Sequence, residues 1–123
     1  MDAKERGFLN GRLKSLGHAM HGLRHLVGSE RNFAIQLGIA IVVTLAGWLV
    51  GLSRQEWILQ TLAIGMVLGA EAMNTALELL SDYVQPSRDK RIGIVKDVAA
   101  AGVTIVALAS AVIGLLIYVP KFL

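Results

Sequence analysis

The stretch "GAEAMNTALELLSDY", residues 69–83, places carboxylate and amide side chains inside an apolar run that begins near Trp57. Apolar runs of about 20 residues are typical of helices that cross the hydrocarbon core of a membrane. Two further segments, residues 32–53 and 98–120, contain no charged residue. We therefore expect an all-α membrane protein with three transmembrane helices, over about residues 32–52, 55–83 and 90–119.

The composition also favours a membrane protein. The chain has 123 residues, of which 54% are hydrophobic, and its mean hydropathy of +0.60 is too high for a soluble domain of this size. It has no cysteine, which excludes disulfides and cysteine-ligated metal sites. The first 31 residues are polar and lack the apolar core of a cleaved signal peptide. We expect a single domain over residues 1–123.

Basic residues are concentrated on one predicted side of the membrane. The segment before the first span and the loop before the third contain most of them: Lys4, Arg6, Arg12, Lys14, Arg24, Arg31, Arg88, Lys90, Arg91 and Lys96. The loop between the first two spans has only Arg54, and the tail has only Lys121. Because cytoplasmic loops carry the excess of Lys and Arg, we expect a cytoplasmic N-terminus and an external C-terminus.

Local signals define the loop between the first two spans. Ser53 and Glu56 have the S-x-x-E spacing of a capping box, which predicts the start of the second span. Trp48 and Trp57 flank this short loop, and Tyr118 lies at the same outer end of the third span. Aromatic side chains of this kind are enriched at membrane–water interfaces.

The N-terminal segment predicts an amphipathic surface helix over about residues 5–28. One apolar stripe recurs every three or four residues: Leu9, Leu13, Leu16, Met20, Leu23 and Val27. Such a helix lies in the cytoplasmic interface with its basic residues near anionic headgroups. His18, His21 and His25 fall on the opposite face. A zinc site is one interpretation, but no acidic or cysteine ligand joins them there, so a solvated polar face is favoured.

The polar residues of the second span form one stripe. Glu71, Asn74, Glu78 and Asp82 are three or four residues apart, so they share a narrow arc of a helix. Insertion of an acidic side chain at the centre of the membrane costs roughly 2.5–3.5 kcal/mol on insertion scales. A hydrogen bond between two membrane helices stabilises their association by only about 0.6–2 kcal/mol. A polar seam that merely fixes packing is therefore disfavoured. A cation path is disfavoured too, because Gln60 and Thr61 are the main polar residues of the outer half.

Acids from three segments converge at the inner leaflet. Glu30 precedes the first span, Lys96 and Asp97 open the third, and the stripe ends the second. Carboxylate oxygens suit Mg²⁺ that is shared with substrate phosphates. A nearby lysine suits phosphate, and the deeper Glu71 suits removal of a proton from a hydroxyl. These residues predict Mg²⁺-dependent phosphoryl chemistry on a lipid, without a Walker motif.

Three motifs carry a resemblance to a known family. They are E-x-x-N-[ST]-A-[IL]-E at residues 71–78 with Asp82, K-D followed by small residues at Lys96, and the acid in "SERNF", Glu30. Over nearly its whole length the chain closely resembles the small prokaryotic membrane kinases of the diacylglycerol kinase/undecaprenol kinase family. Intact motifs disfavour a catalytically dead scaffold.

The resemblance implies ATP- and Mg²⁺-dependent phosphorylation of a lipid alcohol by a homotrimer in the bacterial cell membrane, with active sites shared between subunits. Glu71 would be the catalytic base, and Asn74 would position the base or the phosphoryl group. Glu30 and Glu78 would hold the metal. The residues that would contact the nucleotide are Lys96, Asp97, Gly93, Lys14 and His18.

The resemblance also bears on the acceptor. "SERNF" is more similar to the undecaprenol-kinase branch, so undecaprenol is favoured, with diacylglycerol or relaxed specificity as the alternative. The chain departs from some members at Gly11, where they have arginine, at His18, where they have an aromatic, and at Gln36. No nucleic-acid partner is expected.

Overall fold

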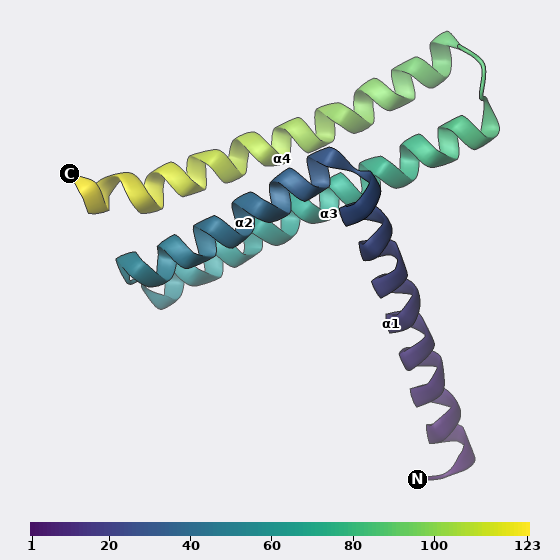
Figure 1. The fold of residues 1–123 in the computed structure, drawn as a ribbon, viewed down its shortest axis with the longest axis horizontal. Helices are drawn as coiled ribbons and strands as arrows, with labels where there is room; N and C mark the ends of the chain where they lie inside the picture. Colours follow the sequence, from purple (N-terminus) through teal and green to yellow (C-terminus); the bar gives the residue numbers. More distant parts are fainter.

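The computed structural model describes residues 1–123 and is entirely helical. Its helices are α1 (Ala3–Ser29), α2 (Arg31–Val50), α3 (Arg54–Val84) and α4 (Lys90–Phe122). Helices α2, α3 and α4 run side by side as a bundle, while α1 turns away from the bundle at the start of α2 (Figure 1). Only α2, α3 and α4 are long and apolar enough to span a membrane, which confirms the three predicted spans.

The α2–α3 hairpin follows from three local features. Gly51 adopts a left-handed backbone with φ of 79°, so α2 ends at Val50 rather than at the predicted residue 52. The predicted capping box is confirmed, since Ser53 Oγ accepts from the Glu56 N–H at 3.2 Å and the Glu56 carboxylate accepts from the Ser53 N–H at 2.9 Å. At Gly47 an added Cβ would lie 2.9 Å from the side chains of Leu52 and Trp57, so the close hairpin requires glycine there.

Helix α4 is longer than predicted. It begins at the predicted residue 90, where Asp89 caps it by accepting from the backbone N–H groups of Arg91 and Ile92 at 2.8 and 3.4 Å. It continues past residue 119 to Phe122 and includes Pro120. Proline lacks an N–H, but in the last turn of a helix this forfeits a single hydrogen bond.

Helix α3 is the central member of the bundle. It packs on both α4 and α2, whereas α1 contacts α2 at the corner between them. The face of α3 turned into the bundle includes Gln60, Val67, Glu71 and Thr75, all less than 9% exposed. Their spacing of seven, four and four residues places them on one side of a helix.

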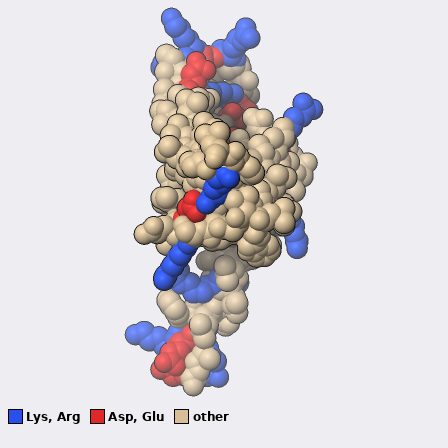
Figure 2. Space-filling model, turned by 90° about the vertical axis from the view of Figure 1, so that its left-hand side faces the viewer, with Lys and Arg blue, Asp and Glu red and all other residues tan.

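Most large apolar side chains are exposed in the isolated chain. Only 9 of the 123 residues are buried. Figure 2 shows groups of charged side chains at the top and bottom of the view, and a mostly tan surface between them that carries a few more charged side chains. Extensive apolar exposure marks surfaces that are covered by a membrane or by other protein.

The helices differ in length, and this sets the shape of one end. We call the end formed by residues 51–53 the hairpin end, and the opposite end, with residues 85–89 between α3 and α4, the linker end. From the hairpin, α2 runs for 20 residues and α3 for 31. At 1.5 Å per residue, α3 extends about 16 Å beyond the start of α2. Figure 1 shows α3 and α4 projecting together past the α1–α2 corner.

Candidate active site

The acidic stripe continues the buried face of α3 toward the linker end. Glu71 is only 7% exposed, and it follows Gln60 and Val67 on the side of α3 that packs against its neighbours. Asn74 and Glu78 are half-buried, and Asp82 is exposed. The stripe thus begins inside the bundle, level with the start of α2, and reaches solvent where α3 extends past that helix.

Asn74 leaves one hydrogen-bond acceptor unused. Its Nδ2 donates to Glu78 Oε1 at 3.3 Å. Its Oδ1 is buried and has no partner. A buried acceptor without a partner costs about 1–3 kcal/mol. Such an atom in a native structure marks a place that a ligand, a water molecule or an ion is expected to fill.

Glu30 forms the corner between α1 and α2. It is a single extended residue, with φ of −111° and ψ of 105°, between two helices. It occupies the N-cap position of α2, but its side chain makes no capping hydrogen bond. The carboxylate is therefore free to act elsewhere.

These residues fit Mg²⁺ in their chemistry, although a single chain does not assemble a complete metal site. No group of three or more His, Asp or Glu side chains is close enough to hold an ion. The hard oxygen donors near the corner are the Glu30 and Glu78 carboxylates and the unpartnered Asn74 Oδ1. Mg²⁺ typically takes one or two carboxylates and completes its shell with phosphate oxygens and water.

Lys96 joins the end of the stripe from α4. Its Nζ lies 2.6 Å from Asp82 Oδ1, which links α4 to α3 near the linker end. Gly93 is half-buried one turn earlier on the same side of α4, and a Cβ there would meet nothing within 4 Å. Asp97 is exposed, on a different side of α4. The structure thus brings Lys96 and Gly93 toward the stripe but not Asp97.

Lys14 and His18 stand apart from the other candidate residues. Both are exposed on α1, which projects away from the bundle (Figure 1). At 1.5 Å per residue they lie roughly 18–24 Å along α1 from Glu30. Within one chain, therefore, the structure does not bring these two predicted nucleotide contacts to the acidic stripe.

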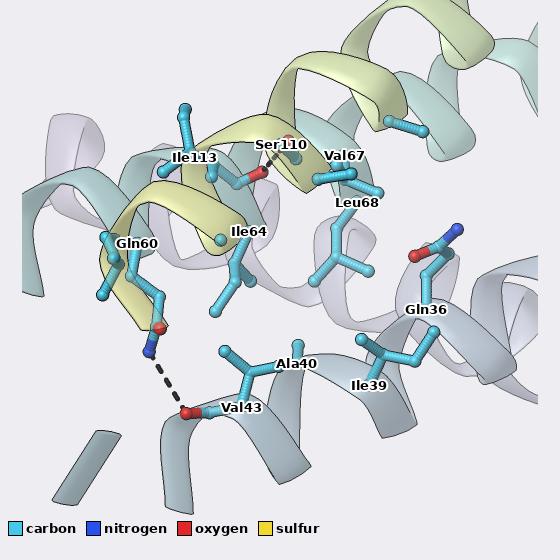
Figure 3. A pocket seen from close by; sticks show the side chains of 15 residues that line it. Gln36, Ile39, Ala40, Val43, Gln60, Ile64, Val67, Leu68, Ser110 and Ile113 are labelled. Atoms are coloured by element: carbon cyan, nitrogen blue, oxygen red, sulfur yellow. Dashed lines mark hydrogen bonds between the residues drawn. The ribbon is translucent and has the colours of Figure 1, made fainter. Parts of the chain in front are cut away.

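A groove that the sequence did not reveal leads toward Glu71. It has a volume of about 310 Å³ and lies between α2 and α4, with α3 as its floor. Figure 3 shows Gln60 and Val43 at one end of the groove and Gln36 at the other. The α3 lining runs from Gln60 to Leu68, so Glu71 lies about one helical turn beyond it. Most lining side chains are apolar.

The hairpin end of the groove is closed by hydrogen bonds. The Tyr118 hydroxyl donates to Gln60 Oε1 and lies 3.0 Å from the Val43 carbonyl oxygen. Gln60 Nε2 donates to the same carbonyl at 3.4 Å. Sequence reasoning assigned Tyr118 to the membrane interface and gave Gln60 no role, because helix periodicity does not show which residues of different helices meet.

Known proteins resemble this chain over most of its length. The sequence model of the family described as prokaryotic diacylglycerol kinase matches residues 17–118. The chain is 38% identical over 122 residues to an undecaprenol kinase of Bacillus subtilis, covering 98% of this chain and 99% of that protein. It is 30% identical over 112 residues to a diacylglycerol kinase of a Synechocystis species, covering 90% of this chain and 64% of that protein. The protein therefore belongs to the prokaryotic diacylglycerol kinase family and is a lipid kinase.

Proposed function

We propose that this kinase transfers the γ-phosphoryl group of ATP to undecaprenol and produces undecaprenyl phosphate, with Mg²⁺ as the metal. The observation that carries the proposal is the acidic stripe of α3, which meets Lys96 beyond the end of an apolar groove. Identity of 38% along the whole length of a protein named undecaprenol kinase supports this acceptor. Diacylglycerol is the second candidate, because another relative is named diacylglycerol kinase.

The groove supports a lipid acceptor with a long hydrocarbon chain. A chain lying between α2 and α4 would bring its hydroxyl to Glu71, one turn beyond the α3 lining. There the Glu71 carboxylate would take the hydroxyl proton as the oxygen attacks the γ-phosphorus and the bond to the departing ADP breaks. Asn74 Oδ1, which has no partner in the chain, would accept a hydrogen bond from an ordered water molecule that positions the phosphoryl group.

The remaining residues would bind the phosphates and the metal. The Lys96 ammonium would neutralise phosphate charge, and the backbone at Gly93 leaves open space beside it. Glu30 and Glu78 would hold Mg²⁺, which neutralises charge on the β- and γ-phosphates when bound. Asp97 would contact the nucleotide from the exposed side of α4. The separation of these residues within one chain indicates that a second chain completes the site.

Assembly and topology are part of the same proposal. We infer a homotrimer with a cytoplasmic linker end, an external C-terminus and α1 lying in the inner interface. The distribution of Lys and Arg supports this orientation. A subunit whose α1 projects away from its own bundle would bring Lys14 and His18 to the site of a neighbour. The closed hairpin end of the groove argues against a cation path through the chain.

A direct assay tests the activity and the acceptor together. Purified protein in detergent receives radiolabelled ATP and either undecaprenol or diacylglycerol at equal mole fraction. We expect Mg²⁺-dependent labelling of undecaprenol at a kcat/KM above that for diacylglycerol. Preference for diacylglycerol would replace the proposed acceptor, and no labelling of either lipid would overturn the proposed reaction.

A further inference from the structure

One ion pair near the linker end includes an acid, Asp82, to which the proposed reaction gives no role. Lys96 Nζ lies 2.6 Å from Asp82 Oδ1 and joins α4 to α3. The other ion pairs of the chain lie elsewhere: Arg91 with Asp89 at the start of α4, and Lys121 with Glu56 near the hairpin end. The pair therefore engages the lysine that the proposed reaction assigns to the ATP phosphates.

Stability does not account for this pair. The side chains of Lys96 and Asp82 are 38% and 62% exposed. Ion pairs as exposed as this contribute about 0–1 kcal/mol. Helices α3 and α4 also pack against each other, so the bundle does not depend on this contact. Its geometric effect is more specific, because it fixes the end of a flexible side chain at one place.

That place is the end of the acidic stripe. Asp82 follows Glu78 by one helical turn, so its carboxylate holds the Lys96 ammonium at the end of the stripe, one turn beyond a proposed metal ligand. An ammonium has three N–H donors. One of them serves Asp82, which leaves two for phosphate oxygens. A lysine without this carboxylate would be free to reach the phosphate headgroups of the surrounding lipids instead.

We propose that Asp82 is a positioning residue, which holds the Lys96 ammonium over the acidic stripe for ATP and away from lipid phosphates. The inference rests on the proposed function and adds to it. ATP would share the ammonium with Asp82 rather than displace it. The contribution of Asp82 would therefore be to ATP capture and not to the rate of phosphoryl transfer.

Asp82→Asn tests the inference in the purified full-length protein with a lipid alcohol at saturation. A coupling near the upper limit for exposed pairs predicts that KM for ATP rises about three- to fivefold. We expect kcat to stay within about twofold, a split that a merely structural residue would not produce. Adding phosphatidylglycerol to the micelles should widen the difference in KM between wild type and variant. Asp82→Glu should restore most of the ATP affinity.

Two further variants make the result specific. In a Lys96→Met background, Asp82→Asn should have no additional effect on KM, because its partner is gone. Asp89→Asn is the matched control. It removes an acid at the same end of the bundle whose partner is Arg91 rather than Lys96, so it should leave KM for ATP unchanged. An unchanged KM in Asp82→Asn, a loss confined to kcat, or additive effects with Lys96→Met would each overturn the inference. A wild-type protein that labels no lipid would instead overturn the proposed function.

Discussion

At the hairpin end of the bundle, the Tyr118 hydroxyl donates to Gln60, and the Val43 carbonyl accepts from Gln60 Nε2. On the side of the bundle toward the linker end, Glu71 is buried and Asn74 Oδ1 has no partner. Both sets of polar groups lie on faces where helices pack. They differ in whether the protein itself supplies the hydrogen-bond partners.

This difference separates a structural role from a functional one. A buried polar group whose partners belong to neighbouring helices ties those helices together. A buried group without a partner lowers stability, and native proteins retain such groups where a ligand or a reaction requires them. We therefore interpret the hairpin end as a tie between α2, α3 and α4, and we propose that the groups toward the linker end form a binding site.

A large contrast between the ends is expected for the proposed metal ligands. Glu30→Gln and Glu78→Gln should each raise the Mg²⁺ concentration that gives half-maximal activity. Loss of a residue that only supports a metal ligand typically lowers metal affinity about 10–100-fold, so loss of a ligand should have at least that effect. Glu56→Gln is the matched control, since Gln preserves a capping box at the hairpin end. An Mg²⁺ titration of the three purified variants measures the effect. Wild-type Mg²⁺ dependence in both Glu30→Gln and Glu78→Gln would remove them from the metal site.

A smaller effect is expected from α1, which joins the bundle at the Glu30 corner. Leu16→Asp with Met20→Asp would place charge on the apolar stripe of α1. Burial of one leucine contributes about 1.5–3 kcal/mol, so docking in the interface should weaken by at least about tenfold. Activity should fall while the three spans remain inserted. His25→Asp adds a charge on the opposite face and serves as the control.

Two measurements distinguish the two faces of α1. One is membrane flotation of the isolated α1 peptide with either set of substitutions, and the other is turnover of the full chain that carries them. If the doubly substituted protein keeps full activity, or if His25→Asp is equally damaging, the apolar stripe does not face the membrane as we propose.

At the hairpin end we expect a change in stability without a change in chemistry. Tyr118→Phe removes the donor to Gln60. Hydrogen bonds between membrane helices contribute about 0.6–2 kcal/mol, so the free energy of unfolding should fall by that amount. Denaturant unfolding in micelles measures this loss, and kcat should remain at the wild-type value. A large drop in kcat in a protein that unfolds normally would show that the hairpin end also takes part in the reaction.

The smallest expected effect concerns the start of α4. The backbone N–H of Arg91, followed by the Arg91 side chain, holds the pKa of Asp89 below its ordinary value of 3.8. A carboxyl with a lowered pKa stabilises the fold above its ordinary pKa and loses that contribution as pH falls through the lowered value. The first turn of α4 should therefore loosen only below about pH 4. NMR shifts of Arg91 and Ile92 report this change.

Asp89→Asn supplies the matched control for this pH dependence. Asparagine caps helices about as well as aspartate but does not titrate, so the transition at the start of α4 should disappear. Persistence of the same acid transition in Asp89→Asn would assign it to another group.

Much of this architecture was predictable from local sequence signals. Uncharged runs predicted α2 and most of α4, and the Ser53–Glu56 spacing predicted the start of α3. The three- and four-residue spacing of the acids placed Glu71 and Glu78 on one face. These features depend on residues that are close together along the chain, so rules of periodicity and helix capping can predict them.

Contacts between helices were not predictable in the same way. The partner of Tyr118 is 58 residues away, and the Lys96–Asp82 pair joins two helices. The sequence shows which face of a helix is polar, but not which face of another helix it meets. For the same reason the groove between α2 and α4 appears only in the structure.

The central claim is that the buried carboxylate of Glu71 serves chemistry rather than packing. The most direct test is Glu71→Gln, with turnover and unfolding measured on the same purified sample at saturating lipid and ATP. General-base catalysis typically contributes about 10²–10⁴-fold, so kcat should fall by that factor. The free energy of unfolding should stay the same or rise, because neutral Gln spares the cost of a buried charge. Turnover near the wild-type value would contradict the account.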